Sequence, residues 1–146
     1  MKLTELTTYQ TTITQARAYR ALKSKMSYFL RDHNITMMQW AIIGSLYAAG
    51  DKGMRVSDLA AALDTSLAFV TTTLNVLEAK NIVTRAHHLQ DNRAKVVQLT
   101  PAFTPKVNEI EQELHQKLYG WLIPAVGRED LVTYVKVLSK IATTTP

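Results

Sequence analysis

The chain has 146 residues and a formal net charge of +5, with 47% hydrophobic and 20% charged residues. This composition is typical of a globular protein, and the length is sufficient for one domain with a substantial core. The absence of cysteine excludes disulfides, thiolate nucleophiles, cysteine zinc sites and thiol redox sensing. The positive charge suits an anionic partner, either nucleic acid or a membrane surface, and is equally consistent with a merely soluble cationic protein.

Two broad classes of protein find no support in the sequence. The N-terminus lacks the apolar segment of a signal peptide, and the longest apolar stretch, residues 40–50, is too short and interrupted to span a bilayer. There is no Gly-rich phosphate loop, nucleophile elbow or paired-carboxylate motif. We therefore expect a cytoplasmic protein without a membrane partner, without a cofactor and without enzymatic activity.

The first third of the chain is predicted to form two helices. Apolar residues recur at helical spacing over residues 5–31, and Asn34 ends that pattern. Thr36 and Gln39 have the spacing of a capping box, which predicts the start of a second helix. That helix is expected to end near Gly50.

Short elements follow. Residues 51–53 predict a turn and residues 54–56 a short extended segment, after which Ser57 is expected to cap a helix. The polar residues 64–66 predict a break, and residues 67–80 predict the next helix.

After residue 80, the residue pattern changes from one typical of helices to one typical of strands. Asn81, which tolerates the left-handed conformation, is expected to end the preceding helix. Residues 82–85 and 96–99 are β-rich, and the polar residues 87–95 between them predict a hairpin with a long tip.

Two helices complete the chain. The first is expected to start at Thr100-Pro101 or at Thr104-Pro105, because both pairs are N-terminal signals, and to end at Pro124 and Gly127. The last is expected over residues 128–142.

The order of these elements predicts the fold class. Two short helices separated by a tight polar break form a helix-turn-helix, and a hairpin directly after the second helix makes it winged. We expect a mainly α chain with a small β-hairpin, forming a single domain over residues 1–146. Within it, we expect a winged helix-turn-helix lobe at 36–100 and a helical region built from 1–33 and 101–146.

The most specific stretch runs from Leu74 to Thr100 and contains a helix end, a turn, a strand ending in Arg, a wing with Asp-x-Arg and a strand ending in Leu-Thr. The residues at those positions are Leu77, Asn81, Arg85, Asp91, Arg93, Leu99 and Thr100. Together with Ile35-Thr36 and Gln39, this pattern resembles the MarR family of transcriptional regulators over about residues 6–141. The resemblance implies a homodimer that binds double-stranded DNA and regulates transcription. We expect a repressor, with an activator as the alternative that the sequence leaves open. Because a two-fold dimer presents two recognition helices, we expect an inverted-repeat operator.

Candidate DNA-binding residues lie on the helix over 67–80 and on the hairpin. Cations suit phosphates, Asn pairs with adenine, and a Thr methyl contacts the thymine methyl. Phe69 is expected either to touch DNA or to pack under the wing. The cations are Arg55, Lys80, Arg85, Arg93 and Lys95. The remaining candidates are Ser66, Ala68, Phe69, Thr71, Thr72, Asn75, His87, His88, Gln90, Asp91 and Asn92.

Two charged residues at the predicted wing tip are expected to act together. The resemblance implies that Arg93 enters the minor groove and that Asp91 helps to hold it. His87 and His88 are adjacent on a strand and point to opposite faces, so we expect no metal site there.

The family often carries Arg at the position of Thr72, whereas residues 66–79 contain no Lys or Arg. This leaves open the alternative of a winged-helix protein-interaction module that no longer reads DNA.

The resemblance also implies intertwined terminal helices and a possible small aromatic or anionic effector. Aromatic residues that are candidates for an effector pocket, or alternatively for the core, are Tyr28, Phe29, His33, Trp40 and Tyr47. Apolar candidates for the dimer interface are Leu6, Tyr9, Ile13, Leu118, Trp121, Leu122, Leu131, Val135, Leu138 and Ile141. A dimer would carry twice the charge of +5, or +10.

Overall fold

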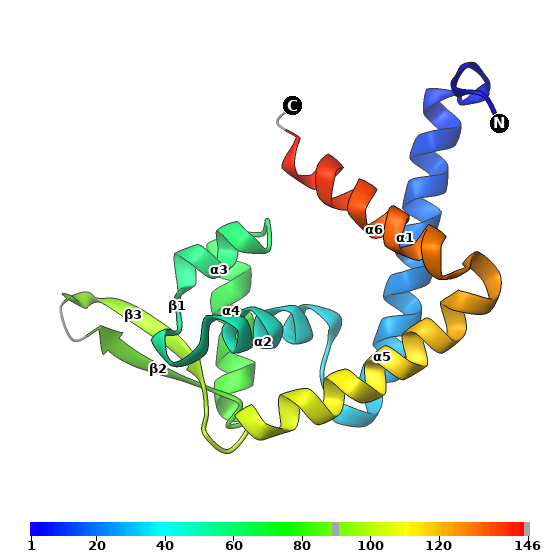
Figure 1. Cartoon of the computed structure of the whole chain (residues 1–146). Coiled ribbons are helices and arrows are strands. Elements are labelled where there is room, and N and C mark those ends of the chain that lie inside the picture. Colours follow the sequence, from blue (N-terminus) through cyan, green and yellow to red (C-terminus); the bar gives the residue numbers. More distant parts are fainter. Residues whose placement is uncertain (89–90, 145–146) are drawn as a thin grey trace.

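The computed structural model describes residues 1–88 and 91–144, with residues 87, 88 and 91–94 described by their backbone alone. It is mainly helical with one small antiparallel sheet, which confirms the predicted fold class. Its helices and strands are α1 (Thr8–Leu30), α2 (Met37–Ala49), β1 (Met54–Arg55), α3 (Val56–Ala62), α4 (Leu67–Ala79), β2 (Val83–His88), β3 (Asp91–Leu99), α5 (Thr104–Val126) and α6 (Arg128–Thr143). Figure 1 shows α2, α3, α4 and the sheet on one side and α1 and α6 on the other, with α5 running between them.

Three helices begin at the polar residues that cap them. Thr36 and Gln39 form the predicted capping box, because each side chain accepts a hydrogen bond from the other residue's backbone N–H at 3.1 Å. The Ser66 hydroxyl accepts from the Phe69 N–H at 3.1 Å at the start of α4, and Thr7 caps α1 in the same way. The prediction that Ser57 caps α3 was wrong, since α3 begins at Val56 and Arg55 occupies the N-cap position.

The helix ends follow from backbone conformation. Asn81 adopts the left-handed conformation with φ of 58°, as predicted, and Asn34, predicted only to end the helical pattern, adopts it as well with φ of 54°. The expectation that Pro124 ends α5 was wrong, because the helix continues to Val126. Pro124 removes one backbone donor, but the Gly127 N–H still bonds to the Ile123 carbonyl at 2.9 Å. Gly127, with φ of 87°, then ends the helix.

The start of α5 is resolved in favour of the second signal, Thr104-Pro105. Thr100 instead organises the preceding turn. Its hydroxyl accepts from the Phe103 N–H at 3.2 Å, and its carbonyl accepts from the Thr104 hydroxyl at 2.9 Å.

The sheet has the strand order β1-β3-β2, with Met54 paired to Val97 and Val83 paired to Leu99. The predicted long tip over residues 87–95 was wrong, because β2 continues to His88 and β3 starts at Asp91. Apart from residues 89–90, which lie outside the described residues, that segment is strand, with His87 paired to Lys95 and His88 paired to Asp91. Backbone pairing requires no apolar side chains, so the sequence pattern gave no sign of it.

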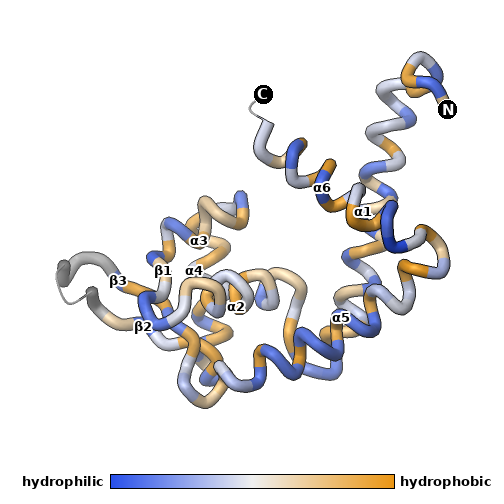
Figure 2. Tube along the Cα trace, in the orientation of Figure 1, coloured by the Kyte–Doolittle hydropathy of each residue, from blue (hydrophilic) through white to orange (hydrophobic). Residues whose placement is uncertain are grey.

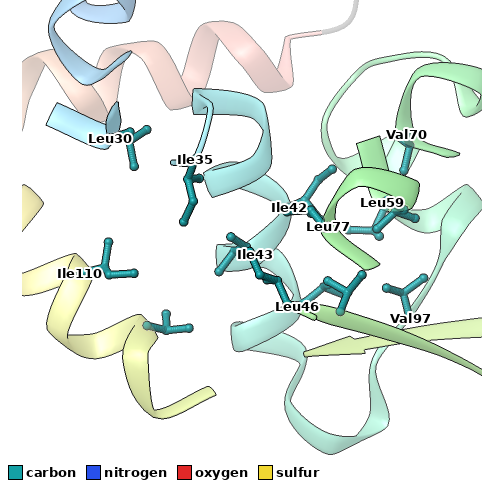
Figure 3. Packing of buried hydrophobic residues seen from close by; sticks show 14 of the residues in the cluster. Leu30, Ile35, Ile42, Ile43, Leu46, Leu59, Val70, Leu77, Val97 and Ile110 are labelled. Atoms are coloured by element: carbon teal, nitrogen blue, oxygen red, sulfur yellow. The ribbon is translucent and has the colours of Figure 1, made fainter. Parts of the chain in front are cut away.

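The core is centred on α2. Figure 3 shows Ile42 and Leu46 facing the side of Leu59, Leu77 and Val97, whereas Ile43 faces the side of Ile110 on α5. All of these side chains are at most 7% exposed. One continuous core therefore joins the helix-turn-helix and sheet to the long helix α5.

No single helix in the described ranges is both long and apolar enough to cross a membrane. Only α3 and α4, taken together as a bent pair, reach that length and apolarity.

Candidate nucleic-acid interface

The helices α3 and α4 form a helix-turn-helix. Their axes are bent by 113° across a break of four residues, within the range of about 90–120° for this motif. Val70, Leu74 and Leu77 bury one side of α4 in the core. The predicted contact residues on α4 are all exposed: Ser66, Ala68, Phe69, Thr71, Thr72 and Asn75. The structure thus places them on the side of α4 that is open to a ligand.

The N-terminal turn of α4 carries more exposed apolar surface than the sequence indicated. Phe69 is 47% exposed, so nearly half of its surface is open to a ligand. Leu67, which was not among the predicted residues, is 55% exposed beside it. Its spacing of three residues before Val70 matches the buried stripe, which hid this position from periodicity analysis.

Arg85, predicted as a phosphate-binding cation, lies against α4. Its Nη2 donates to Asn75 Oδ1 at 2.6 Å, and its Nε lies 3.3 Å from Glu78 Oε2. A longer contact of 3.5 Å joins Nη2 to the Thr71 carbonyl. Only 19% of the Arg85 side chain is exposed. Arg85 therefore connects the base of the wing to α4, and phosphate binding would require these contacts to be exchanged.

Lys80 is also engaged within the chain. Its Nζ donates to the Asn34 carbonyl at 2.6 Å and to Gln39 Oε1 at 3.4 Å. It thereby joins the end of α4 to the connection between α1 and α2. Among the predicted cations with described side chains, Arg55 and Lys95 are the exposed ones.

The side chains of the wing tip lie outside the described part of the structure. Gln90 is not described, and only the backbone is described for His87, His88, Asp91, Asn92 and Arg93. The backbone places His88 opposite Asp91 and His87 opposite Lys95, with an irregularity between the two histidines. The pairing of Arg93 with Asp91 stays a prediction.

In the part of the chain that the structure describes, the five aromatic and histidine candidates lie in different surroundings. Tyr28 and Phe29 pack edge-to-face at 5.9 Å, while Phe29 and Trp40 pack against the core. Tyr47 borders a separate cavity of about 410 Å³ between α2, the base of the wing and the start of α5, which none of the other four lines.

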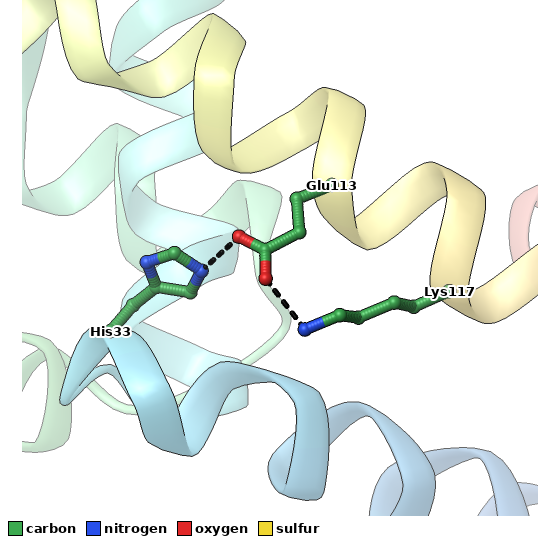
Figure 4. A network of polar contacts seen from close by, with 3 residues as sticks. All are labelled: His33, Glu113 and Lys117. Atoms are coloured by element: carbon green, nitrogen blue, oxygen red, sulfur yellow. Dashed lines mark hydrogen bonds and ion pairs between the residues drawn. The ribbon is translucent and has the colours of Figure 1, made fainter.

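His33 belongs to a polar network that sequence reasoning missed (Figure 4). Its Nε2 lies 2.7 Å from Glu113 Oε2, and Lys117 Nζ donates to Glu113 Oε1 at 2.5 Å. The hydrogen bond from Lys117, followed by that from His33, lowers the pKa of the Glu113 carboxyl, and the bond to Glu113 raises the pKa of Lys117. The network ties the connection between α1 and α2 to α5, across 80 positions of sequence.

This network predicts a pH-dependent contribution to stability. Because the pKa of Glu113 is lowered in the folded state, its contribution is present above the ordinary value of 4.5 and is lost as the pH falls through the folded-state value. We expect Glu113→Gln to lower the urea midpoint at pH 7 and to have a smaller effect at pH 3. Glu109→Gln, which changes an exposed carboxylate on the same helix, is the control and should change little at either pH. A difference between wild type and Glu113→Gln that is equal at both pH values would contradict the assignment.

Comparison with known proteins agrees with this geometry. The MarR family model matches residues 35–95. The structure of NadR in complex with 4-hydroxyphenylacetate is 26% identical, with 99% of each chain covered and a TM-score of 0.73. The MepR–DNA complex of S. aureus is 25% identical, with 97% of this chain and 100% of that chain covered and a TM-score of 0.77.

A third solved structure has a similar fold. Apo MarR from E. coli is 21% identical, with 94% of this chain and 98% of that chain covered and a TM-score of 0.75. The similarity therefore runs through the terminal helices as well as the winged helix-turn-helix. The chain has the fold of the MarR-type transcriptional regulators along nearly its whole length, and the MarR family model matches its winged helix-turn-helix over residues 35–95.

Proposed function

We propose that this chain binds double-stranded DNA in a sequence-specific manner, as a homodimer, and regulates transcription. The observation that carries the proposal is the exposed polar side of α4, presented at a helix-turn-helix angle beside a paired wing. In such motifs the second helix enters the major groove. The similarity to MepR, solved in complex with DNA, supports the same role here.

The proposal assigns DNA binding and dimer formation to different parts of the chain. Residues 36–100 form the DNA-binding lobe, and residues 1–33 and 101–146 form the dimer. Arg55 on β1 and Lys95 on β3 are exposed on two strands that pair directly with each other, where cations suit phosphates. The net charge of +5 per chain supports attraction to a duplex.

Apolar surface on the terminal helices supports the homodimer. Tyr9 and Ile13 on α1 are 65% and 54% exposed, and Val135 and Ile141 on α6 are 51% and 63% exposed. Figure 2 shows hydrophobic segments recurring along α1 and α6, away from the core. Leu131, also predicted for the interface, is only 7% exposed and packs within the protomer.

We expect a mass of twice 16.4 kDa in light scattering at micromolar concentration, because an obligate interface of this type buries more than about 2,000 Å². Val135→Glu places a charge on the apolar side of α6 and should shift the protein toward monomer. Thr133→Glu, on the side of α6 that carries Glu129 and Lys136, is the matched control and should stay dimeric. A monomeric wild-type chain would rule out the homodimer.

The dimer predicts the form of the operator. A two-fold protein presents two copies of α4, so we expect an inverted repeat with half-site centres about one helical turn, roughly 10 base pairs, apart. The exposed Thr71 and Thr72 suit thymine methyl groups, which favours an A·T-rich site. Selection from a random duplex library tests both features. Recovery of G·C-rich single sites would contradict them.

The proposal also includes regulation by a small aromatic or anionic effector. The protein acts as a repressor, and the effector releases it from DNA. The similarity to NadR, solved with 4-hydroxyphenylacetate, supports an effector of that class. The cavity of about 410 Å³ beside Tyr47 is within the size range of small-molecule sites.

The second candidate function is a winged-helix module that binds a protein instead of DNA. One observation favours it: α4 contains no Lys or Arg, and its exposed Leu67 and Phe69 are apolar. Binding that does not weaken with salt would distinguish this function, because only a phosphate binder releases counterions.

A further inference from the structure

The side chains that the first turn of α4 presents to solvent are apolar. Leu67, Ala68 and Phe69 are all exposed, and the residue after them, Val70, is fully buried in the core. Successive residues of a helix are about 100° apart, so these three side chains spread over the open side of the turn. Residues 66–77 carry no charge. We call Leu67, Ala68 and Phe69 the apolar turn.

Hydrogen bonds within the chain hold the apolar turn in place. The Ser66 hydroxyl accepts from the Phe69 N–H at 3.1 Å. The Ala68 carbonyl accepts from the Thr72 hydroxyl at 3.0 Å, and the Phe69 carbonyl accepts from the Thr73 hydroxyl at 2.8 Å. The free chain thus fixes the backbone of the apolar turn before any partner binds.

The position of the apolar turn and the charge of the chain favour DNA as its partner. In a helix-turn-helix, the N-terminal residues of the second helix contact base edges in the major groove. The chain carries a net charge of +5, and Arg55 and Lys95 are exposed on the paired strands β1 and β3. An anionic duplex complements that charge.

The major groove offers one kind of apolar group to such a surface. Its base edges carry hydrogen-bond donors and acceptors and, on thymine alone among the four bases, a C5-methyl group. 5-Methylcytosine carries the same methyl group at the same ring position. We propose, resting on the proposed DNA-binding function, that the apolar turn recognises C5-methyl groups of pyrimidines, with Leu67 and Phe69 as specificity-determining residues.

Recognition of this kind makes binding sensitive to cytosine methylation. At a position that the apolar turn contacts, 5-methylcytosine should substitute for thymine better than cytosine does. Methylation leaves the N4 donor of cytosine in place, so readout by hydrogen bonds alone would not produce this difference.

The test measures the affinity of the full-length protein for operator duplexes in which each thymine is replaced in turn by deoxyuridine, which lacks only the methyl group. Burial of one methyl-sized group is worth roughly 4-fold in affinity, so we expect a loss of about 3- to 5-fold at each contacted thymine. When a contacted T·A pair is changed to C·G, methylation of that cytosine should recover about the same factor.

Three variants connect the effect to the apolar turn. Leu67→Ala and Phe69→Ala truncate the two large side chains and keep the Ser66 cap, and each should remove most of the deoxyuridine effect at the thymine that it contacts. Val76→Ala truncates another exposed apolar residue, two turns further along α4. It is the matched control and should keep the full effect. A melting curve checks that each variant folds, and the deoxyuridine and methylation measurements on the wild type do not depend on the variants.

Three results would overturn the assignment. They are a wild type that binds every deoxyuridine duplex as tightly as the parent duplex, methylation of the substituted cytosine without effect, and a deoxyuridine effect that persists unchanged in both Leu67→Ala and Phe69→Ala. In each of these cases DNA binding itself would be intact, so the proposed function would stand. A wild-type chain that binds no duplex would overturn the proposed function and methyl recognition together.

Discussion

Replacing Gly53 by alanine is expected to lower the free energy of unfolding by about 2–6 kcal/mol. Gly53 has a φ of 63°, a conformation that side chains disfavour. A Cβ at this position would lie against the Val97 carbonyl, and 2.6 Å from Cγ1 of Val96. Both neighbours belong to the central strand of the sheet, and Val97 is fully buried. The chain at this point has no space to move without breaking the pairing of β1 with β3.

Gly50 provides the matched control three residues earlier. Its φ of 66° is almost the same, but a Cβ there would meet nothing within 4 Å. Gly50→Ala should therefore cost only the backbone strain of about 1–3 kcal/mol. Urea unfolding of the wild type and both variants measures the difference, which should be at least about 1 kcal/mol. Equal losses would mean that backbone strain alone, and not the close approach to β3, explains Gly53.

Replacing Arg93 by alanine is expected to weaken DNA binding by about 1–3 kcal/mol, or roughly 10- to 100-fold, without unfolding the protein. Arg93 lies in β3, two residues from the start of the strand at the wing tip. A long cation there can reach the minor groove, where narrow A·T-rich stretches concentrate negative potential. Asp91→Ala should act in the same direction but more weakly, since it would remove only the carboxylate that is predicted to hold Arg93.

The measurement is a DNA titration together with a melting curve for each variant. Lys140→Ala removes the same charge from α6, far along the chain from the wing, and should leave the affinity nearly unchanged. Surface substitutions alter stability by less than about 0.5 kcal/mol, so loss of binding and loss of folding can be separated. Unchanged affinity in Arg93→Ala would mean that the wing does not contact DNA.

Local signals in the sequence were enough to predict most of the fold. The capping box at Thr36 and Gln39, the cap at Ser66 and the left-handed Asn81 each depend on a few neighbouring residues, and the structure confirms all three. The errors have equally local causes. Pro124 fits within the last turn of α5, and the polar segment after Ala86 pairs through its backbone without an apolar pattern.

Contacts between distant side chains were not predictable from the sequence. His33 and Glu113 are 80 positions apart, and nothing in the pattern around either residue indicates a partner. Arg85 and Asn75 were both identified as candidate DNA contacts, yet the structure shows that they bind each other. Which donor meets which acceptor depends on how the wing packs against α4, and this requires coordinates.

The most direct test of DNA binding by this chain is the salt dependence of its affinity for a duplex that carries the selected inverted repeat. If the homodimer neutralises about 6–10 phosphates, the logarithm of the binding constant should fall linearly with the logarithm of salt concentration, with a slope of roughly −5 to −9. The same protein on a random duplex should bind more weakly and also lose affinity as salt increases. An affinity that does not change with salt, or no binding to either duplex, would contradict the account and favour a protein partner for α4 and the wing.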